Sequence, residues 1–534
     1  MKQYAKLILY VFTVLIGSVY ASAAGTKENP LWRTTDDVVD GWDWSLPAYV
    51  EPAPYSGIKF SPPAGAAFPV NQIAVLKSSW RECEPEEGTY DFSPLRKSLA
   101  AVPAAVHGVE LHLYASVKEV RYSSGKKDPG TGPLWLIDRY RVPVIEEKVS
   151  AKIGNPFQVF NFDIYNQEYH RRYCAIIRAF GQSGIASDAK ILIVYVHGKS
   201  SSRGEEAANP KNADEEKVLK ERLSAWADAF GTNAYKLAWV GAEEPMIAYA
   251  YELGMGQRNG FVEQYLNHIP NPSLGQLLDD RGYLVVDEQC PLIKYNRASG
   301  DENEEYSPKE HVARFGPMES WPHRYRESML RALQMRRNFI WSEYTPSIDI
   351  PLFCFTGLEL GRTVNDAPDA WCYLRESVVK RSNYTVKNFE RWLYQRDGEG
   401  SKAEAAVKIP VPELMQNHAP GYYFDCIARK TDKSSGNSNI GFALDDRFLG
   451  RTPAKVAVKI TYHNLYAGRW NLVLHTKSGT AVRAVTAAAD STIRTATFFF
   501  DDAVFAADGY DFDFTVEADT ADAVISFVRV IKIR

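Results

Sequence analysis

From about residue 55 to residue 381 the chain alternates short runs rich in β-branched and aromatic residues with helical stretches. This alternation is typical of parallel strands, because each parallel pair needs a long crossover connection. The runs that read as strands lie at 57–61, 72–80, 109–117, 191–198, 235–241, 258–266, 311–320 and 338–344. Eight strands with eight connections predict a closed (β/α)8 barrel. A doubly wound open sheet is the alternative, but no glycine-rich nucleotide loop follows the first run.

After about residue 383 the pattern changes. Residues 395–421 are polar and contain Gly, Pro and Ala, which is typical of a connection. Beyond them apolar residues recur at every second position, as at Val456, Val458 and Ile460. One-sided burial with short turns predicts an antiparallel β-sandwich. We therefore predict a barrel over 24–382, a connecting segment over 383–419 and a sandwich over 420–534.

The first 23 residues have the pattern of an export signal. Lys2 and Lys6 precede a short apolar run at 7–20, and Ala21-Ser22-Ala23 resembles a signal-peptidase site. A retained membrane anchor is the alternative. No other run is long and apolar enough to cross a bilayer, so we expect no membrane span in the mature chain. The expected location is outside the cytoplasm of a bacterium: periplasmic, cell-surface or secreted.

The composition excludes some classes of partner. A net charge of -4 and a pI near 6.3 do not favour nucleic acid or an anionic membrane. The six cysteines are widely spaced and show no CxxC or Cys/His spacing, so buried free thiols are expected. No metal and no cofactor is predicted. The acidic run at 300–306 reads as a solvated loop that could hold adventitious calcium.

Carboxylates at strand ends are the candidate catalytic groups. In a parallel barrel such groups come from the carboxyl ends of strands. Cleavage of a glycosidic bond needs two of them, a protonated acid and an ionised nucleophile or base. The carboxylates that follow predicted strands are Glu82, Glu84, Glu205, Glu206, Glu243, Glu244, Asp287, Glu288, Glu319 and Glu343.

Two segments resemble a known group of enzymes. "SSWRECEPEEGTYDFSPLRKSL" (78–99) and "PLWL" (133–136) resemble segments of retaining (β/α)8 glycoside hydrolases of clan A, the β-galactosidase and β-agarase kind. The resemblance implies an acid/base Glu after strand four and a nucleophile Glu at the end of strand seven. On the predicted strand count these are Glu205 or Glu206, and Glu319.

The usual "NEP" after strand four is absent, and "HGKSSSRGEE" (197–206) takes its place. This run is similar to the "G…GE" ending of atypical bacterial barrels, which favours Glu205 over Glu206. Glu343 is the rival nucleophile, since a miscount of one strand would promote it. Glu82 and Glu84 are interpreted as scaffold or rim residues.

Further residues are candidates for contact with a sugar, each with a structural alternative. Trp80 could stack on a sugar or belong to the core, and His197 could contact substrate or be structural. Asp287 and Glu288 could accept hydroxyl hydrogen bonds or form a solvated turn. The remaining candidates are Tyr265 and Trp321. In the C-terminal part, 431–450 resembles the first strands of jelly-roll modules of secreted carbohydrate enzymes, for which packing against the barrel is the preferred role.

The sequence thus predicts an exported, metal-independent glycoside hydrolase with a retaining mechanism and a polysaccharide or oligosaccharide substrate. A non-catalytic glycan-binding protein on a degenerate barrel is the alternative, favoured by the missing "NEP". A polysaccharide lyase is a third possibility.

Overall fold

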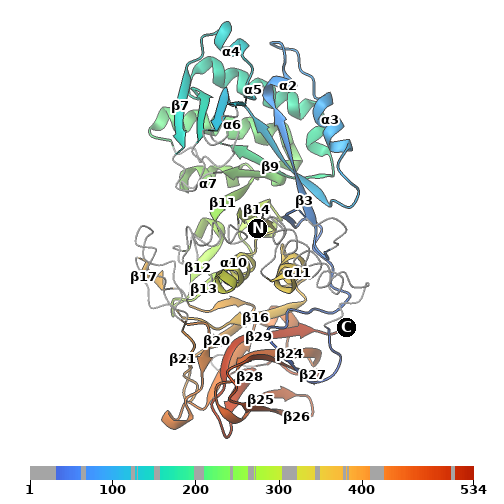
Figure 1. Ribbon diagram of the computed structural model, residues 1–534, viewed down its shortest axis with the longest axis vertical. Helices are drawn as coiled ribbons and strands as arrows, with labels where there is room; N and C mark the ends of the chain where they lie inside the picture. Colours follow the sequence, from blue (N-terminus) through green and yellow to red (C-terminus); the bar gives the residue numbers. More distant parts are fainter. Residues whose placement is uncertain are drawn as a thin grey trace, which may run out of the picture.

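The computed structural model describes most of the chain. The described residues are 32–61, 68–121, 127–128, 130–149, 157–197, 210–240, 244–261, 270, 272–302, 321–342, 349–376, 380–381, 384–385, 387–408, 426–506 and 512–534. Figure 1 shows α2–α6 at one end of the long axis, a large C-terminal sheet at the other end, and α10 and α11 between them.

Eight parallel strands close into a barrel, which confirms the predicted fold class for this part. In chain order they are β2 (Gly57–Lys59), β3 (Gln72–Ser79), β4 (Gly108–Tyr114), β9 (Ile191–His197), β10 (Leu237–Val240), β11 (Gly256–Phe261), β14 (Ser299–Glu302) and β15 (Phe339–Trp341). Each strand pairs with its neighbours in chain order, and β15 pairs with β2 to close the ring.

The predicted identity of strand seven is wrong. β14, at Ser299–Glu302, pairs with β11 and β15 and is therefore the seventh barrel strand. It overlaps the acidic run 300–306, for which the sequence predicts a loop, whereas the predicted strand 311–320 lies outside the described residues. The error has a physical cause: β14 contains Gly and two acidic residues, a composition with low β-propensity that only pairing on both sides turns into a strand.

Helices cover the barrel. They are α2 (Trp80–Cys83), α3 (Ser93–Ala100), α4 (Trp135–Asp138), α5 (Gln167–Gln182), α6 (Ala213–Phe230), α7 (Glu244–Glu252), α8 (Pro291–Lys294), α10 (Trp321–Gln334) and α11 (Ile350–Glu359). The long helices begin at strong caps: the Asn166 side chain accepts hydrogen bonds from two backbone N–H groups of α5, and Asn212 caps α6. Their apolar faces form one core with the outward-facing residues of β4 and β9.

Two small antiparallel sheets are inserted between barrel strands. β5 (Lys118–Arg121), β6 (Lys127–Asp128), β7 (Val144–Val149) and β8 (Phe157–Phe162) form a sheet after the third barrel strand, in the order β6-β5-β8-β7. β12 (Gln276–Leu278) and β13 (Leu284–Val286) form a hairpin between the sixth and seventh barrel strands. Both insertions lengthen connections of the barrel without breaking its ring.

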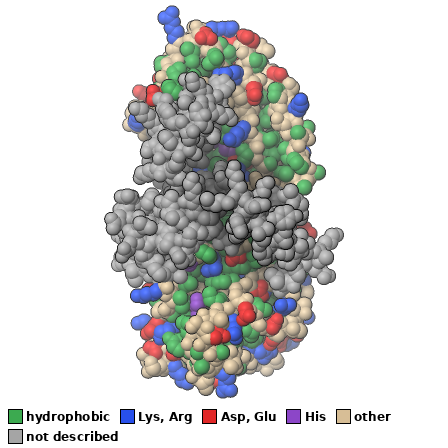
Figure 2. All heavy atoms as spheres, viewed as in Figure 1, with side chains coloured by type: hydrophobic (Ala, Val, Ile, Leu, Met, Phe, Trp, Pro, Cys, Tyr) green, Lys and Arg blue, Asp and Glu red, His purple; other side chains and the backbone are tan. Residues whose placement is uncertain are grey.

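The C-terminal part is an antiparallel all-β domain, as predicted. Its long strands are β23 (Asn439–Leu444), β24 (Ala454–His463), β25 (Ala467–Thr476), β26 (Gly479–Ala488), β27 (Ile493–Ala503), β28 (Phe514–Ala518) and β29 (Val524–Lys532). Side chains of β24 and β25 at alternate positions build its core. On the face shown in Figure 2, charged side chains of both signs are interspersed over this part.

Strands from before residue 420 also belong to this sheet, so its limits differ from the predicted ones. β16 (Asp369–Tyr373) pairs with β29, and β1 (Asp37–Asp40) pairs with β27. β19 (Phe389–Arg391) and β20 (Leu393–Arg396) pair with β16 and β23. Segments that precede the barrel in the sequence and segments that follow it therefore both contribute strands to the C-terminal sheet. These strands tie the two parts together.

Buried ion pairs accompany this junction. Nε of Arg529 lies 2.7 Å from Oδ2 of Asp369, and Nη1 of Arg391 lies 2.7 Å from Oε2 of Glu359. All four side chains are buried. Helices α10 and α11 share an apolar core with residues of β16 and β29, such as Tyr373 and Phe527. Helices of the barrel layer and strands of the sheet thus form one continuous interior.

All six cysteines are free, and five are buried, as expected from their spacing. Within the part of the chain that the structure describes, no helix is long and apolar enough to span a membrane.

Candidate functional site

A row of polar residues on β4 occupies the barrel interior. Glu110, His112 and Tyr114 are buried at alternate positions, whereas Leu111 and Leu113 between them pack against the helical layer. Side chains alternate between the two faces of a strand, so the three polar residues share the inner face. Tyr114 is the last residue of β4, which places this row toward the carboxyl end of the barrel, where active sites of this fold are found.

Hydrogen bonds connect this row to the next strand. Oε1 of Glu110 lies 2.6 Å from Nε2 of His112. Nδ1 of His112 lies 3.1 Å from Nε2 of His197, the last residue of β9, and the Tyr114 hydroxyl lies 3.3 Å from the same Nδ1. We call Glu110, His112 and His197 the Glu-His-His chain. Through its two imidazoles, this chain links the buried Glu110 carboxylate to the carboxyl end of β9, the fourth barrel strand.

Cations from other barrel strands face the same interior. Nζ of Lys59, on β2, lies 3.4 Å from the centre of the Trp341 ring of β15. The guanidinium of Arg258, on β11, lies 5.1 Å from the Trp341 ring and 5.6 Å from the ring of Tyr195. Such cation–π contacts hold the cations over aromatic faces.

These charges shift the pKa values of Glu110 and His112. Burial disfavours ionisation of Glu110, but the hydrogen bond with His112 and the positive charges of Lys59 and Arg258 outweigh it, so the pKa of Glu110 lies below its ordinary value. Burial, aided by Lys59 and Lys77, lowers the pKa of His112 although Glu110 acts in the opposite direction. At neutral pH the site therefore holds an ionised carboxylate beside a neutral imidazole.

The predicted catalytic carboxylates lie outside the described residues. These are Glu205, Glu206, Glu319 and Glu343; Tyr265 also lies outside them, and of Trp321 only its place at the start of α10 is described. The ends of the described barrel strands show where the segments that contain the four carboxylates begin. Residues 198–209 follow β9, residues 303–320 follow β14, and residues 343–348 follow Ser342, which comes directly after β15. In the sequence, each of the three segments therefore comes after the carboxyl end of a barrel strand.

Of the two roles considered for Trp80, the structure shows the core role and no access to a sugar. Its side chain has no exposed surface, and its ring packs edge-on against Trp135, Tyr169 and Tyr173 of the helical layer. Its Nε1 donates to Oε2 of Glu84 at 2.7 Å. This placement leaves no face of the indole for stacking, because Trp80 begins α2 on the outer side of the strands. It also makes Glu84 a scaffold residue, in agreement with the interpretation from the sequence.

We expect Trp80→Phe to lower the free energy of unfolding by about 1–3 kcal/mol, because the buried Glu84 carboxylate loses a hydrogen-bond donor and a small cavity opens. Glycan affinity should not change. Denaturant unfolding and glycan titration of the same variant check both parts. A loss of affinity with unchanged stability would restore the stacking role of Trp80.

Asp287 and Glu288 lie near the C-terminal sheet rather than on a barrel strand. Asp287 is exposed, and its Oδ1 accepts a hydrogen bond from the backbone N–H of Gln289 in a turn. Glu288 is 7% exposed; its Oε1 lies 2.8 Å from Nε of Arg336 and 2.7 Å from Nε1 of Trp392. The Glu288 carboxylate therefore binds other parts of the protein instead of the predicted sugar hydroxyl.

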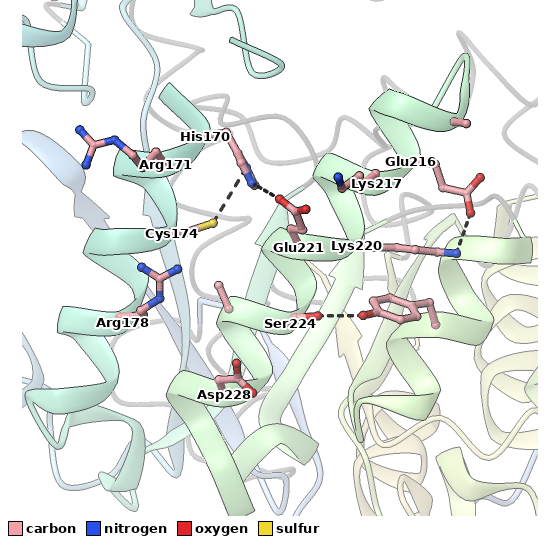
Figure 3. Close-up of a pocket in the computed structure, with 13 residues that line it drawn as sticks. His170, Arg171, Cys174, Arg178, Glu216, Lys217, Lys220, Glu221, Ser224 and Asp228 are labelled. Carbon is pink, nitrogen blue, oxygen red and sulfur yellow. Dashed lines mark hydrogen bonds and ion pairs between the residues drawn. The ribbon is translucent and has the colours of Figure 1, made fainter. Parts of the chain in front are cut away.

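A cavity of about 760 Å³ lies on the outer helices, away from the barrel interior. Figure 3 shows His170 and Cys174 of α5 facing Glu221 of α6 across it. Nε2 of His170 lies 2.8 Å from Oε2 of Glu221, and the Cys174 sulfur lies 3.9 Å from Nδ1 of His170. Burial raises the pKa of the Cys174 thiol, so this Cys-His-Glu arrangement does not supply a reactive thiolate.

Sequence reasoning missed Glu110 and His112. A signal was present in "VELHLY": polar residues alternate with apolar ones in a strand that was predicted to belong to a barrel. In a barrel both faces are covered, so polar residues on one face indicate an interior site rather than a solvated surface. The partner on β9, His197, was identified as a candidate, but its link to β4 required the tertiary structure.

No family model and no curated protein matches the chain. The catalytic domain of a β-amylase from Paenibacillus polymyxa is similar over 51% of this chain and 85% of that one, with 10% identity and a TM-score of 0.30. A trimodular endoglucanase of subfamily GH5_4 matches over 88% and 91%, with 10% identity and a TM-score of 0.30. The PRD1 vertex protein P5 matches over 32% and 74%, with 14% identity and a TM-score of 0.16. Likenesses this weak carry no argument about function.

Proposed function

We propose that the protein is an exported glycoside hydrolase that cleaves O-glycosidic bonds of a poly- or oligosaccharide at the carboxyl end of its barrel. The single observation that supports this best is the buried polar cluster around Glu110, His112 and His197 inside a closed parallel barrel. A barrel interior that needs only stability is filled with apolar residues. Buried ionised groups there are costly, and they are typical of sites that bind polar ligands or move protons.

In the proposed mechanism Glu319 attacks the anomeric carbon, and Glu205 donates a proton to the leaving oxygen and later takes one from water. Glu206 is the alternative acid/base. The corrected strand count adds Glu302, the last residue of β14, as an alternative nucleophile beside Glu343. Each of these residues lies on or follows a barrel strand at its carboxyl end in the chain order described above.

The test is turnover of plant, algal and host polysaccharides by the wild-type protein, with the anomer of the first product followed by proton NMR. A retained configuration supports the proposal, since retention requires carboxyl groups about 5–5.5 Å apart that act in two displacements. An inverted configuration would mean that the second carboxylate activates water as a general base and does not attack the sugar as a nucleophile. Binding without turnover would favour a non-catalytic glycan-binding protein, and unsaturated products would indicate a lyase.

A further inference from the structure

We propose that the protein forms a two-fold symmetric dimer in which the outer edge of β26 pairs antiparallel with the same edge of β26 in a second copy. The inference is independent of the proposed glycosidase activity, because it concerns only the margin of the C-terminal sheet. Figure 1 shows β26 at the end of the molecule opposite α2–α6. Two chains joined at this margin keep the helical layers of both barrels uncovered.

The hairpin that contains β26 determines which backbone groups face outward. β26 pairs with β25 along its whole length, and Thr476 and Gly479 face each other across the two-residue turn 477–478. In such a hairpin this pair exchanges two hydrogen bonds, and hydrogen-bonded pairs recur at every second residue. The residues between these pairs direct their N–H and C=O groups away from β25. These outward residues are Thr480, Val482, Ala484, Thr486 and Ala488.

The outward backbone groups make two contacts within the part of the chain that the structure describes. The N–H of Ala488 donates to Oδ1 of Asn464 at 2.8 Å, in agreement with its outward direction. The carbonyl of Val482 accepts a long hydrogen bond of 3.4 Å from Nη1 of Arg483. All five outward residues are exposed, Val482 by 53%. A strand edge with exposed N–H and C=O groups is a template for pairing with another strand.

Length and charge distinguish β26 from the other marginal strands that the structure describes in this sheet. β1, β19 and β20 have at most four residues and β21 (Glu404–Ala405) has two, and each of them contains a charged residue. β26 has ten residues and one charge, Arg483. The guanidinium of Arg483 lies 5.3 Å from the Phe500 ring, and its Nε lies 3.4 Å from Oδ2 of Asp36. β26 therefore lacks the short length and outward charge that protect an edge from pairing.

The charges around the edge favour a second copy as the partner. Asp36, which contacts Arg483, precedes Asp37 and Asp40 of β1, and all three aspartates are exposed. They disfavour an acidic partner strand by repulsion. β26 itself contains no acidic residue, and its outward residues are uncharged. A strand with this composition can approach the edge without meeting a like charge there.

The sequence of β26 also suits antiparallel pairing with itself. A two-fold axis at Ala484, near the centre of the strand, places Val482 opposite Thr486 of the second copy and forms about six hydrogen bonds between outward groups. It places Arg483 opposite Val485, so the two arginines do not oppose each other. An axis at Arg483 would place them directly opposite, which is destabilising. The axis at Ala484 is therefore the favoured register.

The association should be weak but measurable. A contact along one strand edge is smaller than a standard protein interface, so we expect a Kd of about 1–100 µM. Sedimentation velocity of the wild-type protein, at concentrations that bracket this range, measures it. A wild-type protein that remains monomeric at the highest of these concentrations overturns the proposal.

A charge swap at Ala484 tests the pairing and its register. Ala484→Lys and Ala484→Glu each place like charges opposite each other across the axis, so either variant alone should associate about 3- to 10-fold more weakly than the wild type. An equimolar mixture places Lys opposite Glu and should restore the dimer. Misfolding of the variants would not be rescued by mixing. The matched control is Val38→Lys, on the marginal strand β1, where Val38 is 46% exposed; it should leave association unchanged.

A disulfide tests how close the two strands lie. Residues in a hydrogen-bonded antiparallel pair have Cα atoms about 5.5 Å apart, within the range of a disulfide, so oxidation of Ala484→Cys should link two chains. Thr480→Cys is the control: Thr480 is exposed on the same face of β26, but its two copies would lie about 27 Å apart. Equal linkage of both variants, or no linkage of Ala484→Cys, overturns the proposal.

Discussion

Replacing Glu319 with Gln should lower kcat at least about a thousandfold while the protein still binds its glycan. Glutamine has nearly the same shape as glutamate and can still form hydrogen bonds, but it has no anionic oxygen to attack the anomeric carbon. A loss of this size is typical of removing a nucleophile, because the covalent route then disappears. The measurement is steady-state turnover of the best polysaccharide, combined with a binding titration of the same variant.

The alternative nucleophiles supply the controls for this experiment. Glu343→Gln and Glu302→Gln should reduce turnover much less than Glu319→Gln. If Glu302→Gln alone abolishes turnover, the role belongs to the end of β14, where the corrected strand count places the seventh barrel strand. If all three variants and the wild type bind glycan without cleaving it, the protein is a binder on a degenerate barrel.

Replacing Glu288 with Ala should lower the free energy of unfolding by about 3–5 kcal/mol. Removal of one partner from a buried ion pair leaves the other charge without compensation. Here the guanidinium of Arg336 and the indole N–H of Trp392 would both lose the Glu288 carboxylate, and the backbone N–H of Val364 would lose a weaker contact at 3.3 Å. Arg336 follows α10, and Trp392 lies between β19 and β20 of the C-terminal sheet. Because Glu288 joins these two segments, we expect the two parts to separate earlier in a denaturant titration.

The neighbouring residue is the matched control. Asp287 is exposed, and its Oδ1 accepts a hydrogen bond from a backbone N–H of its own turn, so Asp287→Ala should change stability by no more than about 0.5 kcal/mol. Neither substitution should alter glycan affinity of the folded protein. A specific loss of affinity in Asp287→Ala would restore the predicted role of this pair in sugar binding. Equal stability of the two variants would contradict the buried ion pair.

Residue patterns alone predict only part of the candidate site. Carboxylates could be assigned to strand ends because the fold places active sites there, and His197 was found in this way. Glu110 and His112 sit in the middle of a strand, and no pattern along the chain indicates which neighbour a buried polar residue will contact. Trp80 shows a related limit: its position after a strand is compatible with a cleft or with the core, and only the structure shows that its ring packs into the helical layer.

By itself the sequence determined the architecture: a parallel barrel followed by an antiparallel β domain. Local periodicity reports which face of an element is buried, and that information is sufficient to distinguish crossover helices from hairpins. Only the tertiary structure decided that β14 is the seventh barrel strand, that β1 and β16 join the C-terminal sheet, and that Glu288 pairs with Arg336. These outcomes depend on partners far away in the chain. The free energy of such contacts is gained only when both partners are brought together, so neither segment carries a signal of it alone.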